Sequence, residues 1–157
     1  MPITSVLIVE DVQTKFNDIF SEAKSYFGRD IDVTRADNLN EAEDLVMSGS
    51  WSLIVLDLSM DIAASGSMDL GSGHATLAGL DIVERLFLMK MKIPTVIITG
   101  FDSFQDPDRF DNNIMGVGEV NAIASGMLGD QYLGCIRYGH EDWQNNFQSA
   151  LAKGFSA

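Results

Sequence analysis

Short, wholly apolar runs alternate with helical patterns along this chain, and this alternation limits its possible folds more than any other feature. The runs VLIV (6–9), LIVL (53–56) and TVIIT (95–99) lack the apolar–polar alternation of a half-exposed strand. Such continuous runs are typical of parallel strands that are covered on both faces. Weaker strand patterns occur at 31–36 and 132–138. We therefore expect a sheet built from these five segments.

Each predicted strand is followed, directly or after a longer segment, by a stretch with helical periodicity. These stretches are 12–27, 38–49, 79–91, 115–127 and 140–155. In the second stretch, Asn38 fits an N-cap and Gly49 fits a stop signal. Strands that alternate with helices predict an α/β fold, with an open parallel sheet and helices on both faces. The length of 157 residues suits a single domain, which we place at 1–157.

Composition and charge exclude several classes of protein. The formal net charge is −13, so the surface repels nucleic acid phosphates and anionic membranes, and we expect no direct nucleic acid binding. No apolar run reaches about 18 residues, so no membrane insertion is expected. The N-terminus lacks the basic region of a signal peptide. A single cysteine, Cys135, rules out an internal disulfide, and these features together predict a reducing, cytoplasmic setting.

Acidic residues follow two of the apolar strands. Glu10 and Asp11 come directly after the first strand, Asp57 follows the third, and Thr99 ends the fourth. The C-terminal ends of parallel strands share one edge of the sheet, where ligands bind. Carboxylates gathered there repel each other unless a cation lies among them, and hard oxygen ligands suit Mg²⁺. Taken alone, Glu10 and Asp11 fit a helix N-cap or a solvated loop better than a metal site.

The segments VLIVED, LIVLDLSM and VIITG follow one another on alternating strands, and as a set they resemble a response-regulator receiver domain. The resemblance extends over nearly the whole chain. It implies a flavodoxin-like, doubly wound, five-stranded parallel sheet with helices on both faces and the strand order 2-1-3-4-5.

The resemblance also implies roles for individual residues. Asp57 resembles the phosphoacceptor, and Glu10 and Asp11 resemble the acidic pair that holds Mg²⁺ together with Asp57. The backbone carbonyl of Ser59 resembles a further metal ligand, and Thr99 resembles the hydroxyl that moves toward the phosphoryl group. A carboxylate that attacks a phosphodonor becomes an acyl phosphate, and Mg²⁺ with a cationic side chain spreads the developing charge.

As a whole, the resemblance implies a two-component signalling protein rather than an enzyme. Its expected partners are a sensor histidine kinase or a phosphotransfer protein, and a downstream protein that reads a conformational change. Formation of a homodimer stays an open alternative. A phosphohydrolase that uses Asp57 as nucleophile is disfavoured, because enzymes of the haloacid dehalogenase type need a second aspartate where this chain has Ser59.

The chain departs from the family pattern near its last strand. The family places a lysine at the end of that strand, but the sequence here is CIRYGHEDW. Arg137 is a candidate substitute, since a guanidinium pairs well with phosphate. If Tyr138 takes the position instead, the site lacks this cation. That departure motivates a second hypothesis, a pseudo-receiver that acts as a phosphorylation-independent protein-interaction module.

Two segments are longer than the family requires. Residues 61–78 form an insertion rich in Gly and Ser, which predicts a flexible flap beside Asp57. Residues 100–131 form an extended segment between the fourth and fifth strands. The aromatic switch residue that the family carries on the last strand has two candidates, Tyr132 and Tyr138.

Overall fold

The computed structural model describes residues 3–59, 77–105 and 114–155. Five strands form a parallel sheet in the order β2-β1-β3-β4-β7, which confirms the predicted fold class and order, the last predicted strand being β7. The strands are β1 (Thr4–Val9), β2 (Ile31–Ala36), β3 (Leu53–Leu56), β4 (Thr95–Thr99) and β7 (Tyr132–Arg137). The three central strands carry the predicted apolar runs and are almost wholly buried.

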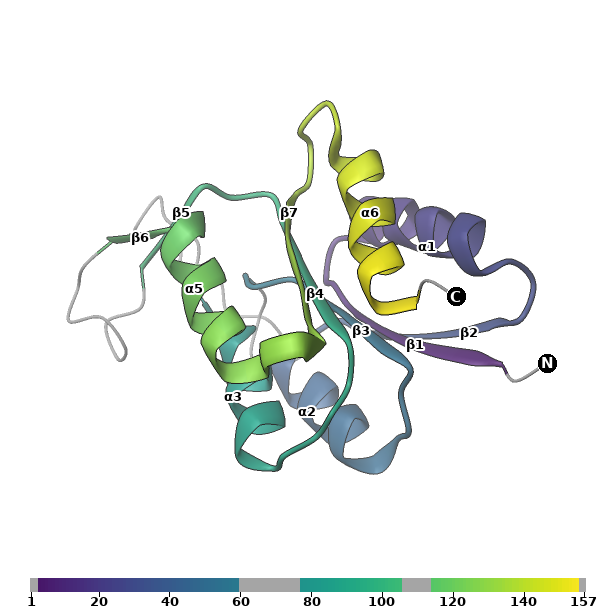
Figure 1. Ribbon diagram of the computed structural model, residues 1–157, viewed down its shortest axis with the longest axis horizontal. Coiled ribbons are helices and arrows are strands. Elements are labelled where there is room, and N and C mark those ends of the chain that lie inside the picture. Colours follow the sequence, from purple (N-terminus) through teal and green to yellow (C-terminus); the bar gives the residue numbers. More distant parts are fainter. Residues whose placement is uncertain (1–2, 60–76, 106–113, 156–157) are drawn as a thin grey trace.

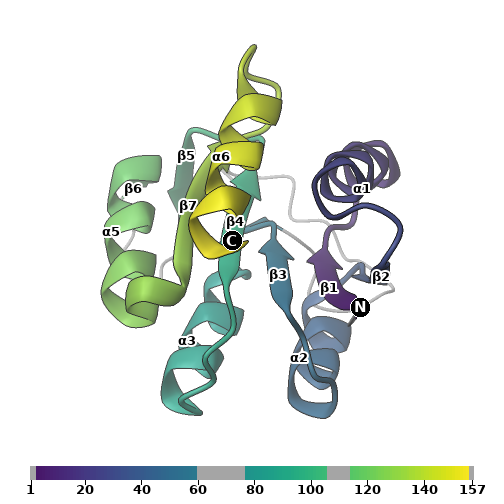
Figure 2. The same ribbon diagram turned by 45° about the vertical axis from the view of Figure 1, so that its right-hand side comes forward.

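Helices cover both faces of the sheet (Figure 1). One face carries α1 (Gln13–Phe27) and α6 (Trp143–Phe155), and the other carries α2 (Leu39–Ser48), α3 (Leu80–Leu88) and α5 (Val117–Leu128). Figure 2 shows the sheet running between these two layers. Successive residues of β1 enter opposite cores: Val6 and Ile8 pack with α1 and α6, while Leu7 and Val9 pack with the other three helices. This alternation is why the residues at the centre of β1 and along β3 are all apolar.

Local signals place the helix ends as predicted. The side chain of Asn38 accepts a hydrogen bond of 2.9 Å from the backbone N–H of Glu41 and so caps α2. Gly49 follows that helix and donates its N–H to the carbonyl of Leu45. Gly28 ends α1 with a φ of 80°, a conformation that favours glycine over residues with a side chain. No helix in the described ranges is both long and apolar enough to span a bilayer.

The first part of the predicted extended segment 100–131, between β4 and α5, contains regular structure that the sequence did not predict. Two short strands, β5 (Ser103–Gln105) and β6 (Ile114–Gly116), pair antiparallel there, and residues 106–113 between them lie outside the described part. Phe104 is fully buried in the core beneath α5. Burial of one large aromatic side chain anchors a segment whose other residues are mostly polar.

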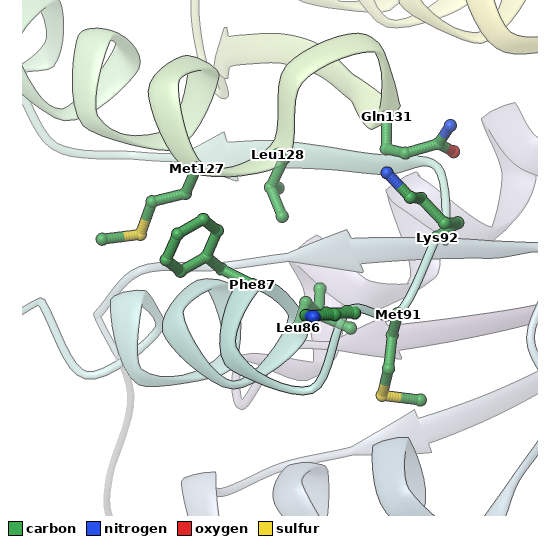
Figure 3. A pocket seen from close by; sticks show the side chains of 8 residues that line it. Leu86, Phe87, Met91, Lys92, Met127, Leu128 and Gln131 are labelled. Atoms are coloured by element: carbon green, nitrogen blue, oxygen red, sulfur yellow. The ribbon is translucent and has the colours of Figure 1, made fainter.

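The sheet edge opposite the acidic strand ends carries an apolar groove of about 230 Å³ between the end of α3 and the end of α5. Its lining residues are Leu86, Phe87, Lys90, Met91, Lys92, Met127, Leu128 and Gln131. Figure 3 shows Phe87 and Met127 on opposite sides of this groove. The side chain of Phe87 is 51% exposed, because it lies at the margin of the apolar face of α3.

Candidate functional site

Three carboxylates meet at the C-terminal edge of the sheet. Glu10 and Asp11 belong to the loop after β1, and Asp57 directly follows β3, the neighbouring strand. One oxygen from each of these side chains lies within 4.8 Å of the other two. The structure therefore brings together the acidic residues that the sequence predicted as a cluster.

Two of the three carboxylates, those of Glu10 and Asp57, are deeply buried. Glu10 is fully buried and Asp57 is 4% exposed. The second oxygen of Glu10, Oε2, accepts a hydrogen bond of 3.0 Å from the backbone N–H of Val12. Asp57 accepts a hydrogen bond from the backbone of Ser59. These backbone donors fix both carboxylates in place without neutralising their charge.

Lys15 is the cation that contacts these carboxylates. This residue lies in the first turn of α1 and is 6% exposed. Its Nζ is 2.7 Å from Oε1 of Glu10 and 3.2 Å from Oδ1 of Asp57. The same nitrogen donates a hydrogen bond of 3.0 Å to the backbone carbonyl of Ile98 on β4. One ammonium group thus links helix α1 to the ends of β1, β3 and β4.

Burial makes both carboxylates harder to ionise. The pKa of Asp57 is raised mainly because the group is removed from water, and the nearby charge of Asp11 raises it further. The pKa of Glu10 is raised by burial and then by the charge of Asp57. Lys15 opposes both shifts, because its positive charge favours the ionised forms. One buried ammonium does not offset the burial of two carboxylates.

Arg35 on β2 holds the loop that carries the acidic pair. Its Nε donates to the backbone carbonyl of Glu10 at 3.0 Å, and Nη2 donates to that of Asp11 at 3.1 Å. Nη1 donates to Oε1 of Gln13 at 2.6 Å. The planar guanidinium provides several donors in a fixed geometry, so a single side chain orients three successive parts of this loop.

Gly79 brings the start of α3 against the backbone of Asp57. Its N–H donates to the carbonyl of Leu58 at 2.8 Å. A Cβ at this position would lie 2.3 Å from the carbonyl oxygen of Asp57 and 2.8 Å from Cα of Leu58. Only a residue without a side chain permits this approach, so Gly79 sets the backbone path directly after the candidate phosphoacceptor.

Thr99 and Gly100 lie at the end of β4, one strand away from Asp57. Thr99 is fully buried, and its Oγ1 accepts a hydrogen bond of 3.2 Å from the N–H of Phe101. A Cβ at Gly100 would meet nothing within 4 Å, so there is open space beside this residue. Ser59 supplies the hydrogen bond to Asp57 described above, and its predicted role as a metal ligand through its carbonyl stays a prediction.

The end of β7 shows why Arg137 does not face the carboxylates. Opposite β4, the register shifts between Thr95 and Val96, which pair with Tyr132 and Gly134. This irregularity resets the alternation of side chains along β7. Tyr138 consequently packs on the α1 and α6 side, where Lys15 lies 5.6 Å from its ring centre.

The guanidinium of Arg137 pairs instead with the exposed carboxylate of Asp102. Within the described residues, the prediction that Arg137 replaces the family's lysine therefore finds no support in the contacts, and Lys15 takes the place beside Asp57. The two candidates for the aromatic switch residue, Tyr132 and Tyr138, contact different helices. The hydroxyl of Tyr132 donates to Oδ1 of Asn121 on α5 at 2.7 Å, and that of Tyr138 donates to Oδ2 of Asp18 on α1 at 2.6 Å.

Oxygen atoms at this site fit a hard divalent cation such as Mg²⁺. Oε1 of Glu10 and Oδ1 of Asp57 are buried, and among the described residues the ammonium group of Lys15 is the donor that contacts them. Each of these oxygens keeps a further lone pair for another ligand. When all four groups are ionised, three carboxylates and one ammonium leave a net charge of −2. A divalent ion would neutralise this charge.

Sequence reasoning missed Lys15 and Arg35. The buried positions of α1 are Lys15, Ile19 and Ala23, and the neighbouring Phe16 is partly buried against the same core. Their spacing of four residues was visible in the sequence, and a lysine on such a stripe one turn after an acidic pair is a recognisable signal. No comparable signal exists for Arg35, because its role depends on strand pairing.

Part of the predicted insertion cannot be compared with the structure. Residues 60–76 lie outside the described part, so only the last two residues of the 61–78 insertion are placed. Of these, Leu77 is buried in the core on the α3 side of the sheet. The flap and its role stay a prediction.

No family profile and no curated protein matches this sequence. Solved structures do match over nearly the full length. The chain resembles the receiver domain of the Francisella response regulator 1452, with 17% identity, a TM-score of 0.56 and 96% of each chain covered. It also resembles the non-phosphorylated HemR receiver domain of Leptospira biflexa, with 18% identity, a TM-score of 0.60 and coverage of 98% of this chain and 95% of the other.

A third similar structure is a response regulator protein of Burkholderia pseudomallei with a phosphorylated aspartic acid, a calcium ion and citrate. The identity is 17% and the TM-score is 0.56, and the match covers 98% of this chain and 67% of the other. These likenesses show that the chain has the fold of response-regulator receiver domains, which confirms the resemblance seen in the sequence.

Proposed function

We propose that this chain is a response-regulator receiver that accepts a phosphoryl group on Asp57 in a Mg²⁺-dependent reaction and signals through a conformational change to a protein partner. The observation that carries the proposal is the convergence of the buried Glu10 and Asp57 with the half-buried Asp11, with one oxygen of each within 4.8 Å of the others. This convergence occurs at the sheet edge where α/β folds bind their ligands.

The chemistry follows from the groups at this edge. A carboxylate oxygen of Asp57 attacks the phosphorus of a phosphohistidine, and the bond between phosphorus and nitrogen breaks, with its electron pair passing to the imidazole. The product is an acyl phosphate on Asp57. Bound Mg²⁺, held by Glu10, Asp11, Asp57 and the carbonyl of Ser59, would supply charge neutralisation for the phosphoryl oxygens.

The proposed partners are a sensor histidine kinase or phosphotransfer protein and a downstream protein, in the cytoplasm. The hydroxyl of Thr99 would carry the signal by moving toward the new phosphoryl oxygens. Because the phosphoryl group stays on the protein, the chain is not proposed to be an enzyme that turns over a free substrate. A homodimer is one form that the signalling state could take.

Intact-mass measurement tests this proposal directly. The protein is incubated with acetyl phosphate and Mg²⁺, and a mass gain of one phosphoryl group is expected. The gain should be absent in Asp57→Asn and in a sample treated with EDTA. Beryllofluoride with Mg²⁺ should also perturb the fluorescence of Trp143, whose ring packs on Tyr138 near the site, at a centroid distance of 5.2 Å. A folded protein that shows neither response would overturn the proposal.

A pseudo-receiver is the second candidate, and one observation favours it. Lys15 already pairs with Glu10 and Asp57, so the pocket holds a cation of its own. In that case the carboxylates and the ammonium form a constitutive structural cluster. The two candidates differ in metal binding, because calorimetric titration with Mg²⁺ should show one site for the receiver and none for the pseudo-receiver.

A further inference from the structure

We propose that Lys15, in the first turn of α1, supplies the positive charge that faces the phosphoryl group on Asp57, in place of the strand-end lysine of other receivers. This inference rests on the proposed phosphoacceptor function. It places the positively charged side chain of the site on helix α1 instead of at the end of strand β7.

Three contacts hold the ammonium group of Lys15 at the reacting carboxylate. Its Nζ lies 3.2 Å from Oδ1 of Asp57 and 2.7 Å from Oε1 of Glu10, and it donates a hydrogen bond to the carbonyl of Ile98. The side chain is 93% buried, since 7% of it is exposed. A buried and anchored charge requires little reorganisation when negative charge develops beside it, which makes it effective in stabilising a transition state.

No comparable cation reaches the site from β7. Arg137 pairs with the exposed carboxylate of Asp102. Tyr138 takes the position that faces the acidic pocket, and its ring lies 5.6 Å from Nζ of Lys15. The phenol stays protonated at neutral pH, because its hydrogen bond to Asp18 and then burial raise the pKa of Tyr138 to about 12. The ring can therefore pack beside the ammonium but cannot replace its charge.

If Lys15 had a purely structural role, its ammonium group would have to balance the charge of the carboxylates without a metal ion. The charges argue against this, because three carboxylates and one ammonium still carry a net charge of −2 when ionised. One divalent ion would balance this net charge of −2. Lys15, which contacts Asp57, would then also contact a phosphoryl group bonded to Asp57. During transfer from acetyl phosphate, a carboxylate oxygen of Asp57 bonds to phosphorus and acetate leaves with the electron pair. Lys15 keeps its proton and contacts the oxygens that gain charge.

The test compares Lys15→Met with Lys24→Met, which removes an exposed lysine from the same helix. We expect labelling by acetyl phosphate to slow about 100-fold in Lys15→Met, a typical effect of losing one preorganised donor. Lys24→Met should label at the rate of the unmodified protein. If the unmodified protein is not labelled, the proposed function fails. If Lys15→Met is labelled as fast as the unmodified protein, only the present inference fails.

Binding of Mg²⁺ to the unphosphorylated protein separates a charge role from a structural one. Removal of Lys15 takes a positive charge away from the metal ligands and frees Oε1 of Glu10. Lys15→Met should therefore bind Mg²⁺ at least as tightly as the unmodified protein in a calorimetric titration, although it is labelled more slowly. Weaker metal binding in a folded Lys15→Met variant would indicate a structural role and overturn the inference.

A second variant places a positive charge at position 138, directly after β7, in place of the one removed from α1. Tyr138 lies next to Lys15, so Tyr138→Lys in the Lys15→Met background should restore most of the labelling rate. This double variant also keeps a cation in the pocket, and it decides the question if Lys15→Met alone fails to fold. A folded double variant that is not labelled would overturn the inference.

Discussion

The ammonium group of Lys15 lies 2.7 Å from Oε1 of Glu10 and is shared with a second carboxylate, that of Asp57. Removal of Asp57 would leave the closer ion pair intact. The buried cluster therefore contains more negative than positive charge in the absence of a metal ion. This surplus governs both the stability of the protein and its response to pH.

Asp57→Asn should stabilise the metal-free protein at neutral pH. The amide has nearly the shape of the carboxylate but does not carry the buried charge, and Lys15 keeps its partner Glu10. We expect the free energy of unfolding to rise by about 1–2 kcal/mol, because the change removes the burial cost of one carboxylate and its repulsion with Glu10 and Asp11. Urea denaturation in EDTA measures the effect. Asp44→Asn, at an exposed position of α2, is the control and should change little.

The advantage of Asp57→Asn should disappear in acid. A carboxyl group whose pKa is raised by folding stabilises the protein below its ordinary pKa of 3.8, and this stabilisation is lost as the pH rises through the folded value. The unmodified protein therefore gains stability relative to the variant as the pH falls from 7 toward 4. Parallel curves for the two proteins over that range would contradict a raised pKa for Asp57.

Affinity for Mg²⁺ should fall as the medium becomes acidic. Burial raises the pKa of Glu10 and of Asp57, and both groups must lose their protons to bind a metal ion. Calorimetric titrations between pH 8 and pH 5 should show weaker binding at each lower pH, with proton release on binding. In Glu10→Gln the dependence on pH should be shallower, because one of the two titrating ligands is gone.

The sequence was sufficient to predict the five strands of the main sheet and the acidic cluster, because each depends on a strong local pattern, whereas the strand order was implied by the family resemblance. Wholly apolar runs must be buried strands, and the residues after β1 and β3 must lie at one edge if these strands are parallel neighbours. The helix ends at Asn38 and Gly49 likewise follow from single residues with a clear preference.

The cation at the site could not be assigned in the same way. The orientation of Arg137 depends on the irregular pairing of β7 with β4, and strand patterns do not reveal where a bulge occurs. Lys15 was recoverable from its spacing to Ile19 and Ala23, but a lysine on a helix is ordinarily read as exposed. Phe104 shows the same limit, since its burial in the core could not be inferred from the mostly polar residues around it.

Arg35→Lys should weaken metal binding without removing any metal ligand. The guanidinium donates to the carbonyls of Glu10 and Asp11 and to Gln13, and an ammonium cannot make all of these contacts at once. Loss of groups that orient ligands commonly lowers metal affinity about 10-fold or more. Calorimetric titration with Mg²⁺ measures this, and Arg29→Lys, at an exposed turn, is the matched control. Equal affinity in both variants would show that the loop holds its shape without Arg35.

Gly79→Ala should destabilise the protein and distort the site, because the added Cβ would lie 2.3 Å from the carbonyl oxygen of Asp57. The start of α3 must move away from the backbone after β3, and overpacking of this kind typically lowers the free energy of unfolding by about 1–3 kcal/mol. The matched control is Gly126→Ala in α5, where a Cβ meets nothing within 4 Å.

Gly79→Ala and Gly126→Ala are the same chemical change, but we expect them to shift the free energy of unfolding in opposite directions. Gly126→Ala should stabilise the protein by about 0.5–1 kcal/mol, because alanine favours the helix interior. Urea denaturation of the two variants measures both effects, and labelling by acetyl phosphate should decline in Gly79→Ala alone. If Gly79→Ala matched the control in both measurements, α3 would not need its close approach to Asp57, and the backbone after β3 would be held by other contacts.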